Sequence, residues 1–231
     1  MHGRIKGEAA FRRYVARASD ELRQANYTVS AVDLIVTPTR TVEEVILSTD
    51  GPKGRVDLPI AIVTDRGPGG LVEIRMYFST WPITGEHAIR PPLLQHDPNV
   101  HEKGAVGDYQ RALAAGDLAA TLAAFEPQAT VREPAGGEYT HTGTAELTEL
   151  YTLFFSNGGG IPLEHCTVPD DGRACALEYN VTQWGRAAMP PEAGVAVYVR
   201  GASGKLIAAR IYDDSNPPLH RPDPSFAGCV L

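Results

Sequence analysis

Residues Val106 to Tyr151 read VGDYQRALAAGDLAATLAAFEPQATVREPAGGEYTHTGTAELTELY. The apolar spacing predicts two short helices, Val106–Ala115 and Asp117–Phe125. Gly116 suits the left-handed end of the first helix, and Asp117 is a favourable N-terminal residue for the second. An extended segment, Ala129–Tyr139, is expected to follow them.

This extended segment carries the carboxylate of Glu133 between Val131 and Pro134. A third helix is expected to start near Thr144, because apolar residues recur after it at helical spacing on one face. These residues are Leu147, Leu150, Tyr151 and Phe154. The order helix, helix, acid-bearing strand, helix predicts the front half of a conical α+β fold.

Three motifs in this stretch carry a family resemblance. Leu113–Leu118 matches an L-x-A-G-D-L turn, Ala129–Gly136 an A-T-V-x-D/E-P-x-G strand, and Gly143–Ala145 a G-T-A helix start. The stretch therefore resembles the ketosteroid isomerase and SnoaL-like cyclase branch of the nuclear transport factor 2-like superfamily. The resemblance extends over about residues 106–213 and implies a cone of curved antiparallel sheet and helices.

The resemblance also implies roles for individual residues. The acid before the proline is the general base of the isomerases, which assigns that role to Glu133. The tyrosine before the turn donates a hydrogen bond to the substrate oxygen, which assigns that role to Tyr109. The position of the family's protonated acid falls on Ala196, so one donor to the oxyanion would be missing. Such a loss typically costs about 3–4 kcal/mol of transition-state stabilisation and argues against ordinary steroid isomerisation.

The two halves of the chain contain matching segments. Leu71–Tyr77 (LVEIRMY) matches Leu206–Tyr212 (LIAARIY), with arginine and tyrosine at the same places. The helix start Gly7–Ala9 likewise parallels Gly143–Ala145. We therefore predict an α+β protein with two cone domains in tandem, the first of which lacks the opening helix pair and the acid-bearing strand.

The expected elements divide the chain into four parts. A helix over Glu8–Asn26 opens the first part, and its strands are expected at Thr28–Thr37, Thr41–Thr49, Val56–Asp65 and Leu71–Thr80. The later strands are expected at Pro162–Val168, Arg173–Trp184, Ala193–Arg200 and Lys205–Asp213. The predicted parts are an incomplete cone over 1–90, a linker over 91–104, the SnoaL-like domain over 105–216 and an extended tail over 217–231.

Five further residues are candidates for binding the substrate. Glu178, Asn180 and Trp184 share one face of their strand, because side chains alternate along a strand. That face could line the cone or could lie between the two sheets, and the sequence favours neither. Tyr198 and Arg210 are the candidates on the following strands.

The repeated arginine and tyrosine suggest a structural role as well. Arg75 and Tyr77 stand where Arg210 and Tyr212 stand in the second half, and a role in tying down the sheet explains both occurrences better than catalysis does. Asp213–Asp214, at the end of the last strand, is expected to be solvated.

Composition bounds the class of protein. With 43% hydrophobic and 21% charged residues and a formal net charge of −7, the 231-residue chain shows no electrostatic signature for nucleic acid or anionic membranes. No apolar run reaches membrane-spanning length. Three cysteines without metal or paired spacing favour a reducing cytoplasm. His96 and His101, near Asp97, lack a third strong ligand, so neither a metal nor another cofactor is expected.

The sequence leaves the function open between related alternatives. A desolvated Glu133 could remove a proton next to a carbonyl, for double-bond migration or aldol-type ring closure. Glu133 could instead pair with Arg132 or Arg210 and leave a passive binding pocket, and epoxide hydrolysis is a third alternative. The expected partner is a small hydrophobic carbonyl compound. Two cones in one chain would form an intramolecular pseudo-dimer and leave a monomer or a weak homodimer.

Overall fold

The computed structural model of this protein describes residues 5–51 and 54–216, so the predicted tail over 217–231 lies outside the described residues. The first half, residues 5–90, contains a four-stranded antiparallel sheet with strand order β1-β2-β3-β4. Its elements are α1 (Glu8–Gln24), β1 (Thr28–Val36), β2 (Arg40–Gly51), β3 (Gly54–Gly67), β4 (Gly70–Tyr77) and α2 (Trp81–Thr84).

The second half, residues 104–216, contains a six-stranded sheet with strand order β6-β5-β10-β9-β8-β7. Its strands pair antiparallel except for β5 and β10, which run parallel. Its elements are α3 (Gly104–Ala115), α4 (Leu118–Ala123), β5 (Phe125–Arg132), η1 (Gly137–Tyr139), β6 (Thr140–Thr142), α5 (Gly143–Phe154), β7 (Leu163–Thr167), β8 (Ala174–Trp184), β9 (Ala187–Arg200) and β10 (Leu206–Tyr212).

The two sheets share a strand plan, which confirms the predicted α+β fold of two curved antiparallel sheets with helices. The order β1-β2-β3-β4 recurs as β7-β8-β9-β10, and each series follows a helix, α1 or α5. Even an irregularity recurs: Glu44 pairs with Asp33 beside a register shift, and Glu178 pairs with Thr167 beside another. Among the described residues, the helix pair α3–α4 and the strands β5 and β6 occur in the second half alone.

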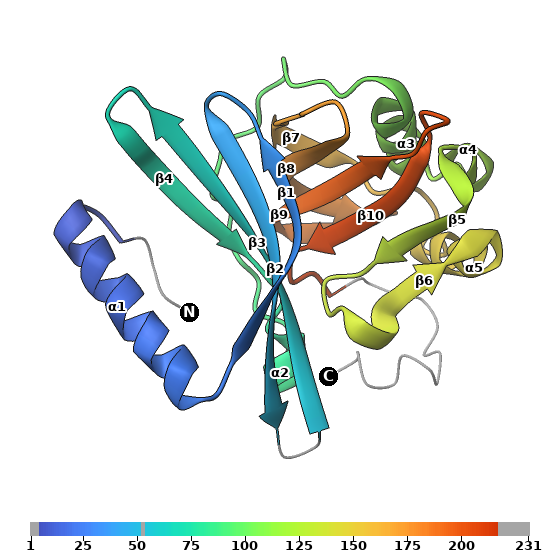
Figure 1. Cartoon of the computed structure of the whole chain (residues 1–231). Coiled ribbons are helices and arrows are strands. Elements are labelled where there is room, and N and C mark those ends of the chain that lie inside the picture. The colour runs from blue at the N-terminus through green and yellow to red at the C-terminus, as the bar shows by residue number, and fades with distance from the viewer. Residues whose placement is uncertain (1–4, 52–53, 217–231) are drawn as a thin grey trace.

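The sheets pack face to face (Figure 1). α1 lies beyond the first sheet, and α3, α4 and α5 lie beyond the second. The layer between the sheets is apolar at its centre and takes residues from both halves. Its buried members are Ile35, Val42, Ala61, Val63, Tyr77, Ala174, Ala176, Ala193, Val195, Val197, Val199 and Tyr212.

Two buried ion-pair clusters cross this layer in reciprocal fashion. Arg75 on β4 donates to both carboxylate oxygens of Glu178, at 2.6 and 2.9 Å, and the Tyr77 hydroxyl donates to the same carboxylate at 2.7 Å. In the opposite direction, Arg210 on β10 donates to Glu44 at 2.8 and 2.5 Å.

The second cluster is completed by Tyr212, whose hydroxyl donates to Glu44 at 2.5 Å. Ser79 and Asp214, which follow the two tyrosines by two residues, contact each other at 2.5 Å. Each half therefore contributes the same surface to the contact, which is the pattern of a two-fold symmetric interface.

The outer helices differ in how deeply they pack. α5 buries Gly143, Leu147, Leu150 and Tyr151, whereas α1 has no buried residue. The predicted apolar face of α1 is only partly covered, and Val15 on it is 43% exposed. Since α3, α4 and β5 pack beside α5, the second half encloses an interior between its sheet and its helices.

Candidate functional site

A cavity of about 90 Å³ lies in this interior. Among the described residues that line it, Glu133 and Asp213 are the acidic ones, and none is lysine, arginine or histidine. The full lining consists of Tyr109, Leu113, Val131, Glu133, Pro134, Tyr151, Phe154, Ile161, Leu163, Tyr179, Val181, Trp184, Tyr198, Ile211, Asp213 and Ser215. The cavity is thus an aromatic and aliphatic space that holds two carboxyl groups.

Glu133 reaches the cavity from the turn after β5. Its backbone N–H donates to the carbonyl of Tyr139 at 2.9 Å, and its carbonyl accepts from Gly136 at 2.9 Å. Gly136 has a φ of 66°, and a side chain there would also collide with the Pro59 ring at 2.6 Å. This turn aims the Glu133 carboxylate inward.

His141 is the hydrogen-bond partner of Glu133. It lies on β6 opposite Val131, and its Nε2 is 2.7 Å from Glu133 Oε1. The Glu133 side chain is 16% exposed and the His141 side chain 23%. The carboxylate is therefore shielded from water and held in place by a ring that itself reaches the solvent.

Two tyrosine hydroxyls meet in the same cavity. Tyr151 on α5 donates to Tyr109 on α3, with an oxygen–oxygen distance of 2.9 Å. Burial raises the pKa of Tyr109 to about 12 and the pKa of Tyr151 well above its ordinary value. Both phenols therefore keep their protons at neutral pH, and the proton of Tyr109 is available to a ligand.

Asp213 is the second carboxyl group of the cavity, and it is only 8% exposed. The Tyr179 hydroxyl donates to it at 2.6 Å, and burial raises the pKa of Asp213 above its ordinary value. Glu192 lies behind it, accepting from the Asp214 backbone at 2.9 Å and from the Ser215 hydroxyl at 3.0 Å. Burial, and then the charge of Asp213, raise the pKa of Glu192 to about 8.

The expectation that Asp213–Asp214 is solvated is therefore wrong. Asp214 is 2% exposed and lies 3.0 Å from His87 Nδ1. It also accepts from the backbone N–H groups of Thr80 at 3.1 Å and Ala88 at 2.7 Å. The segment after β10 thus turns inward and joins the two halves.

The structure brings four of the seven predicted site residues together. Glu133, Tyr109, Trp184 and Tyr198 all line the cavity. The Trp184 indole donates to a backbone carbonyl of α5 at 2.8 Å, and the Tyr198 hydroxyl accepts from Gln110 at 2.7 Å. Their polar ends are thus fixed by α5 and α3.

The other three predicted substrate-binding residues need correction. Glu178 and Arg210 form the reciprocal ion pairs between the sheets, because their strand faces point toward the other half. Asn180 shares that face, is 4% exposed and donates to the carbonyl of Leu94 at 3.1 Å. None of the three is among the described residues that line the cavity.

Tyr151, Tyr179 and Asp213 also line the cavity and were not predicted as site residues. The position expected for the second acid, Ala196, is fully buried in the core of the second half. Strand alternation puts Asp213 on the same face of the last strand as Ile211, but the sequence alone does not say that this face lines the cavity.

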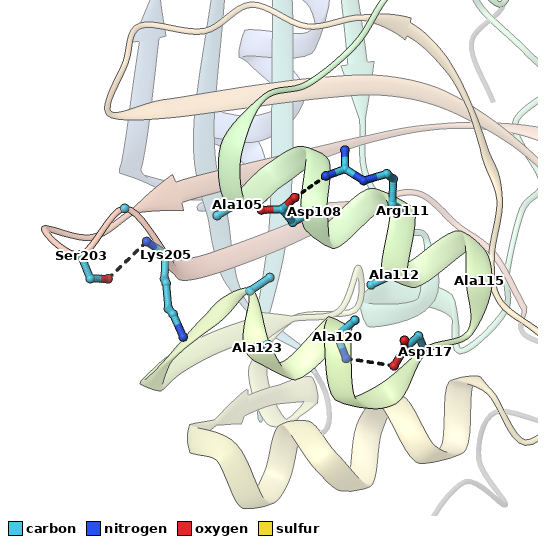
Figure 2. Close-up of a pocket in the computed structure, with 12 residues that line it drawn as sticks. Ala105, Asp108, Arg111, Ala112, Ala115, Asp117, Ala120, Ala123, Ser203 and Lys205 are labelled. Atoms are coloured by element: carbon cyan, nitrogen blue, oxygen red, sulfur yellow. Dashed lines mark hydrogen bonds and ion pairs between the residues drawn. The ribbon is translucent and has the colours of Figure 1, made fainter.

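A larger hollow of about 650 Å³ lies outside the cone, between α3, α4 and the β9–β10 hairpin (Figure 2). Alanines make up much of its wall, and its polar groups largely engage one another. Asp108 pairs with Arg111, Asp117 accepts from the N–H of Ala120 at 3.0 Å, and Ser203 accepts from the N–H of Lys205 at 3.2 Å. The cavity of the cone, with its convergent acids and phenols, is the better candidate site.

Two further observations concern metals and membranes. Over residues 5–51 and 54–216, no group of three or more His, Cys, Asp and Glu side chains is arranged to hold a metal ion. No helix in the described part of the chain is long and apolar enough to cross a membrane.

Comparison with known proteins gives structural neighbours alone. No protein-family model and no curated protein matches the sequence. An NTF2-like protein from Cytophaga hutchinsonii is 16% identical, with a TM-score of 0.39, over 49% of this chain and 89% of its own. A SnoaL-like protein from Burkholderia thailandensis is 14% identical, with a TM-score of 0.40, over 47% and 90%.

A third neighbour is an epoxide hydrolase/cyclase-like enzyme that has a role in pyran ring formation in the polyether salinomycin. It is 20% identical, with a TM-score of 0.42, over 49% of this chain and 90% of its own. Each neighbour matches about half of this chain. The likeness to these three proteins concerns the fold alone.

Proposed function

We propose that the second half catalyses proton transfer next to a carbonyl group of a small molecule, as an isomerase or a cyclase. The observation that supports this most is Glu133, a shielded carboxylate that faces an otherwise largely apolar cavity. A base in such a place is poorly solvated and well positioned to remove a proton from carbon.

The roles of the other groups follow from the chemistry. Glu133 takes the proton α to the carbonyl, and the developing enolate oxygen accepts a hydrogen bond from Tyr109, which Tyr151 holds in place. Return of the proton at another carbon gives double-bond migration. Attack of the carbanion on a second carbonyl gives an aldol-type ring closure, and the resulting alkoxide takes back the proton from Glu133.

The cavity limits the size and charge of the substrate. Its volume of about 90 Å³ is well below the roughly 300–1,000 Å³ of sites for drug-sized ligands. Its lining acids disfavour anionic ligands. The proposed substrate is a small, hydrophobic, neutral carbonyl compound, handled without a cofactor in the cytoplasm.

Two other functions have different support. A non-catalytic small-molecule binder is the second candidate, because the cavity is lined mainly by apolar and aromatic side chains. Epoxide opening by an Asp-Arg-Asp group has less support, since Arg210 is engaged with Glu44 and no arginine is among the described lining residues.

The test is solvent-deuterium incorporation into a panel of small ketones, followed by NMR in D₂O. Glu133→Gln keeps the shape of the side chain and removes its basicity, so exchange should fall by about 10²–10⁴-fold while ligand affinity changes little. Glu149→Gln, at an exposed position on α5, is the matched control and should exchange like the wild type. Equal exchange by wild type and Glu133→Gln would end the proposed mechanism.

A further inference from the structure

Tyr179, Glu192 and Asp213 form a polar cluster beside the cavity. The matching positions of the first half hold apolar residues. Strand register around Glu178 and Glu44, and the matching ends of β10 and β4, assign a first-half position to each of its members. The pairs of matching residues are Tyr179 and Val45, Glu192 and Leu58, and Asp213 and Phe78.

The first-half residues form an apolar cluster. Val45 and Leu58 are each 6% exposed, and Phe78 packs against them. The same sheet position is therefore stable with hydrocarbon side chains. Because buried polar groups cost stability unless they are satisfied, the fold alone does not explain a tyrosine and two acids at these places.

The surroundings of the two acids favour a neutral state. The charged or titratable groups near Asp213 are Glu192 on β9, its neighbour Asp214, and His87 and Arg90 on the connector between the halves, besides the phenol of Tyr179. The His87 side chain contacts the carboxylate of Asp214 instead. Among the ion pairs of the described residues, none involves Asp213 or Glu192. Two carboxyl groups buried together without a paired cation retain a proton.

We propose that Asp213, backed by Glu192, is a protonated acid that donates a hydrogen bond to a second oxygen of the ligand. Arg132 on β5 pairs with Arg210 on β10, so Glu133 lies beside Ile211, and Asp213 follows two residues further along. Base and acid therefore occupy the same end of the cavity, on neighbouring strands.

This arrangement deepens the proposed function, on which it rests, by naming the class of substrate. With Tyr109 and Asp213 as donors and Glu133 as base, the cavity suits a small neutral compound with two oxygen acceptors, such as a 1,3-dicarbonyl compound. A hydrogen bond to each oxygen makes the carbon between them more acidic and assists removal of its proton. Carboxylates are disfavoured, because an anion would enter a largely apolar site beside the carboxylate of Glu133.

The protonation state can be measured without a ligand. Infrared difference spectra of the full chain at neutral pH should show the C=O stretch of a protonated carboxyl group in the wild type. Asp213→Asn should weaken this band by the contribution of one carboxyl group and leave that of Glu192, whereas Asp214→Asn should retain the full band. Absence of the band in the wild type, or an unchanged band in Asp213→Asn, would overturn the proposal.

The ligand class is tested by binding. Calorimetry or NMR titration should show that the wild type binds pentane-2,4-dione about tenfold more tightly than pentan-2-one, as one added hydrogen bond predicts, and acetoacetate more weakly than the dione. Asp213→Leu should abolish the preference, and Asp213→Asn, a neutral donor of similar shape, should retain it. Glu133→Gln should keep the preference while exchange is lost, so this inference and the proposed function can fail separately. Equal affinity of the wild type for dione and monoketone would refute the second-oxygen contact.

Discussion

The two halves build the same sheet and put it to different use. In each, four antiparallel strands follow a helix, and an Arg-x-Tyr segment in the last strand reaches across to a glutamate of the other half. Only the second half adds α3, α4, β5 and β6 within the described residues, and its helix α5 packs with buried side chains beside the cavity, whereas α1 has no buried residue.

The difference shows that the sheet alone does not make the site. Glu133 follows β5, Tyr109 lies on α3 and Tyr151 lies on α5, so three of the cavity's polar groups come from outside the four strands that the two halves share. The sheet positions themselves are permissive, since Asp213 in one half corresponds to Phe78 in the other. The site of the second half thus depends on its helices and added strands, and on a few substitutions in the strands that both halves share.

The largest loss of stability is expected from changes to the ion-pair clusters, which both halves contain. Glu178→Ala removes the carboxylate that satisfies Arg75 and Tyr77 in the layer between the sheets, and Glu44→Ala does the same to Arg210 and Tyr212. Breaking a buried ion pair typically costs about 3–5 kcal/mol, so both variants should lose stability by similar amounts in denaturant titrations.

Glu43→Gln is the control for these variants, because Glu43 is exposed on the same strand as Glu44. Its free energy of unfolding should stay within about 0.5 kcal/mol of the wild type. A loss below about 1 kcal/mol for either alanine variant would show that the two clusters are not equivalent supports of the interface.

The next largest loss of stability should distinguish α5 from α1, the outer helices of the two halves. Leu150→Ala on α5 removes a side chain that is 2% exposed and should cost about 2–5 kcal/mol. Leu22→Ala on α1 removes a half-buried side chain from a helix with no buried residue, and should cost about 1 kcal/mol or less. Equal losses in chemical denaturation would mean that α1 packs as α5 does.

A smaller effect appears in the pH dependence of stability. Glu192 is an acid whose folded-state pKa, about 8, lies above its ordinary value of 4.5. Between these values the folded state binds more protons than the unfolded state, so stability should fall as pH rises through this window, by at most about 1.4 kcal/mol per pH unit from this group.

Glu192→Leu, which copies Leu58 of the first half, should reduce this slope by the contribution of Glu192 and leave that of Asp213, and Glu149→Gln should leave the full slope in place. Unfolding by urea at several pH values between 5 and 8 measures both. A slope that is unchanged in Glu192→Leu would show that Glu192 is ionised throughout the window.

The smallest effect is expected on the oligomeric state, which should not change. Because each half already covers the reciprocal surface of the other, we propose that the chain is a monomer or a weak dimer. Light scattering should give the mass of one chain across micromolar concentrations, for the wild type and for Glu43→Gln alike. A tight dimer at nanomolar concentration would contradict the proposal.

Much of the cone was predictable because its signals are local. The helix ends at Gly116 and Asp117 and the motif around Glu133 placed Tyr109 and Glu133 on segments that do meet in one cavity. The repeated Arg-x-Tyr segments indicated a structural role, and the ion pairs with Glu178 and Glu44 agree with it.

The errors arose where long-range packing decides. Alternation groups Glu178 with Asn180 on one face, but it cannot say that this face meets a second sheet. Asp213 looked like a solvated strand end, because nothing local reveals that the chain after β10 turns inward to meet the connector at His87. The cavity's second acid therefore came from the structure.

Joining the two halves in one chain has a further consequence for their contact. A covalent link holds the two surfaces at an effective concentration in the millimolar range, so the contact needs little affinity of its own to stay closed. The contact surface is also encoded twice in the chain, once in each half, so the two versions can change in sequence independently. Arg75 has recruited Asp65 as an additional partner at 2.7 Å, whereas Arg210 has recruited Asp33 at 2.9 Å. A homodimer cannot make that distinction, since every substitution in it appears on both sides at once.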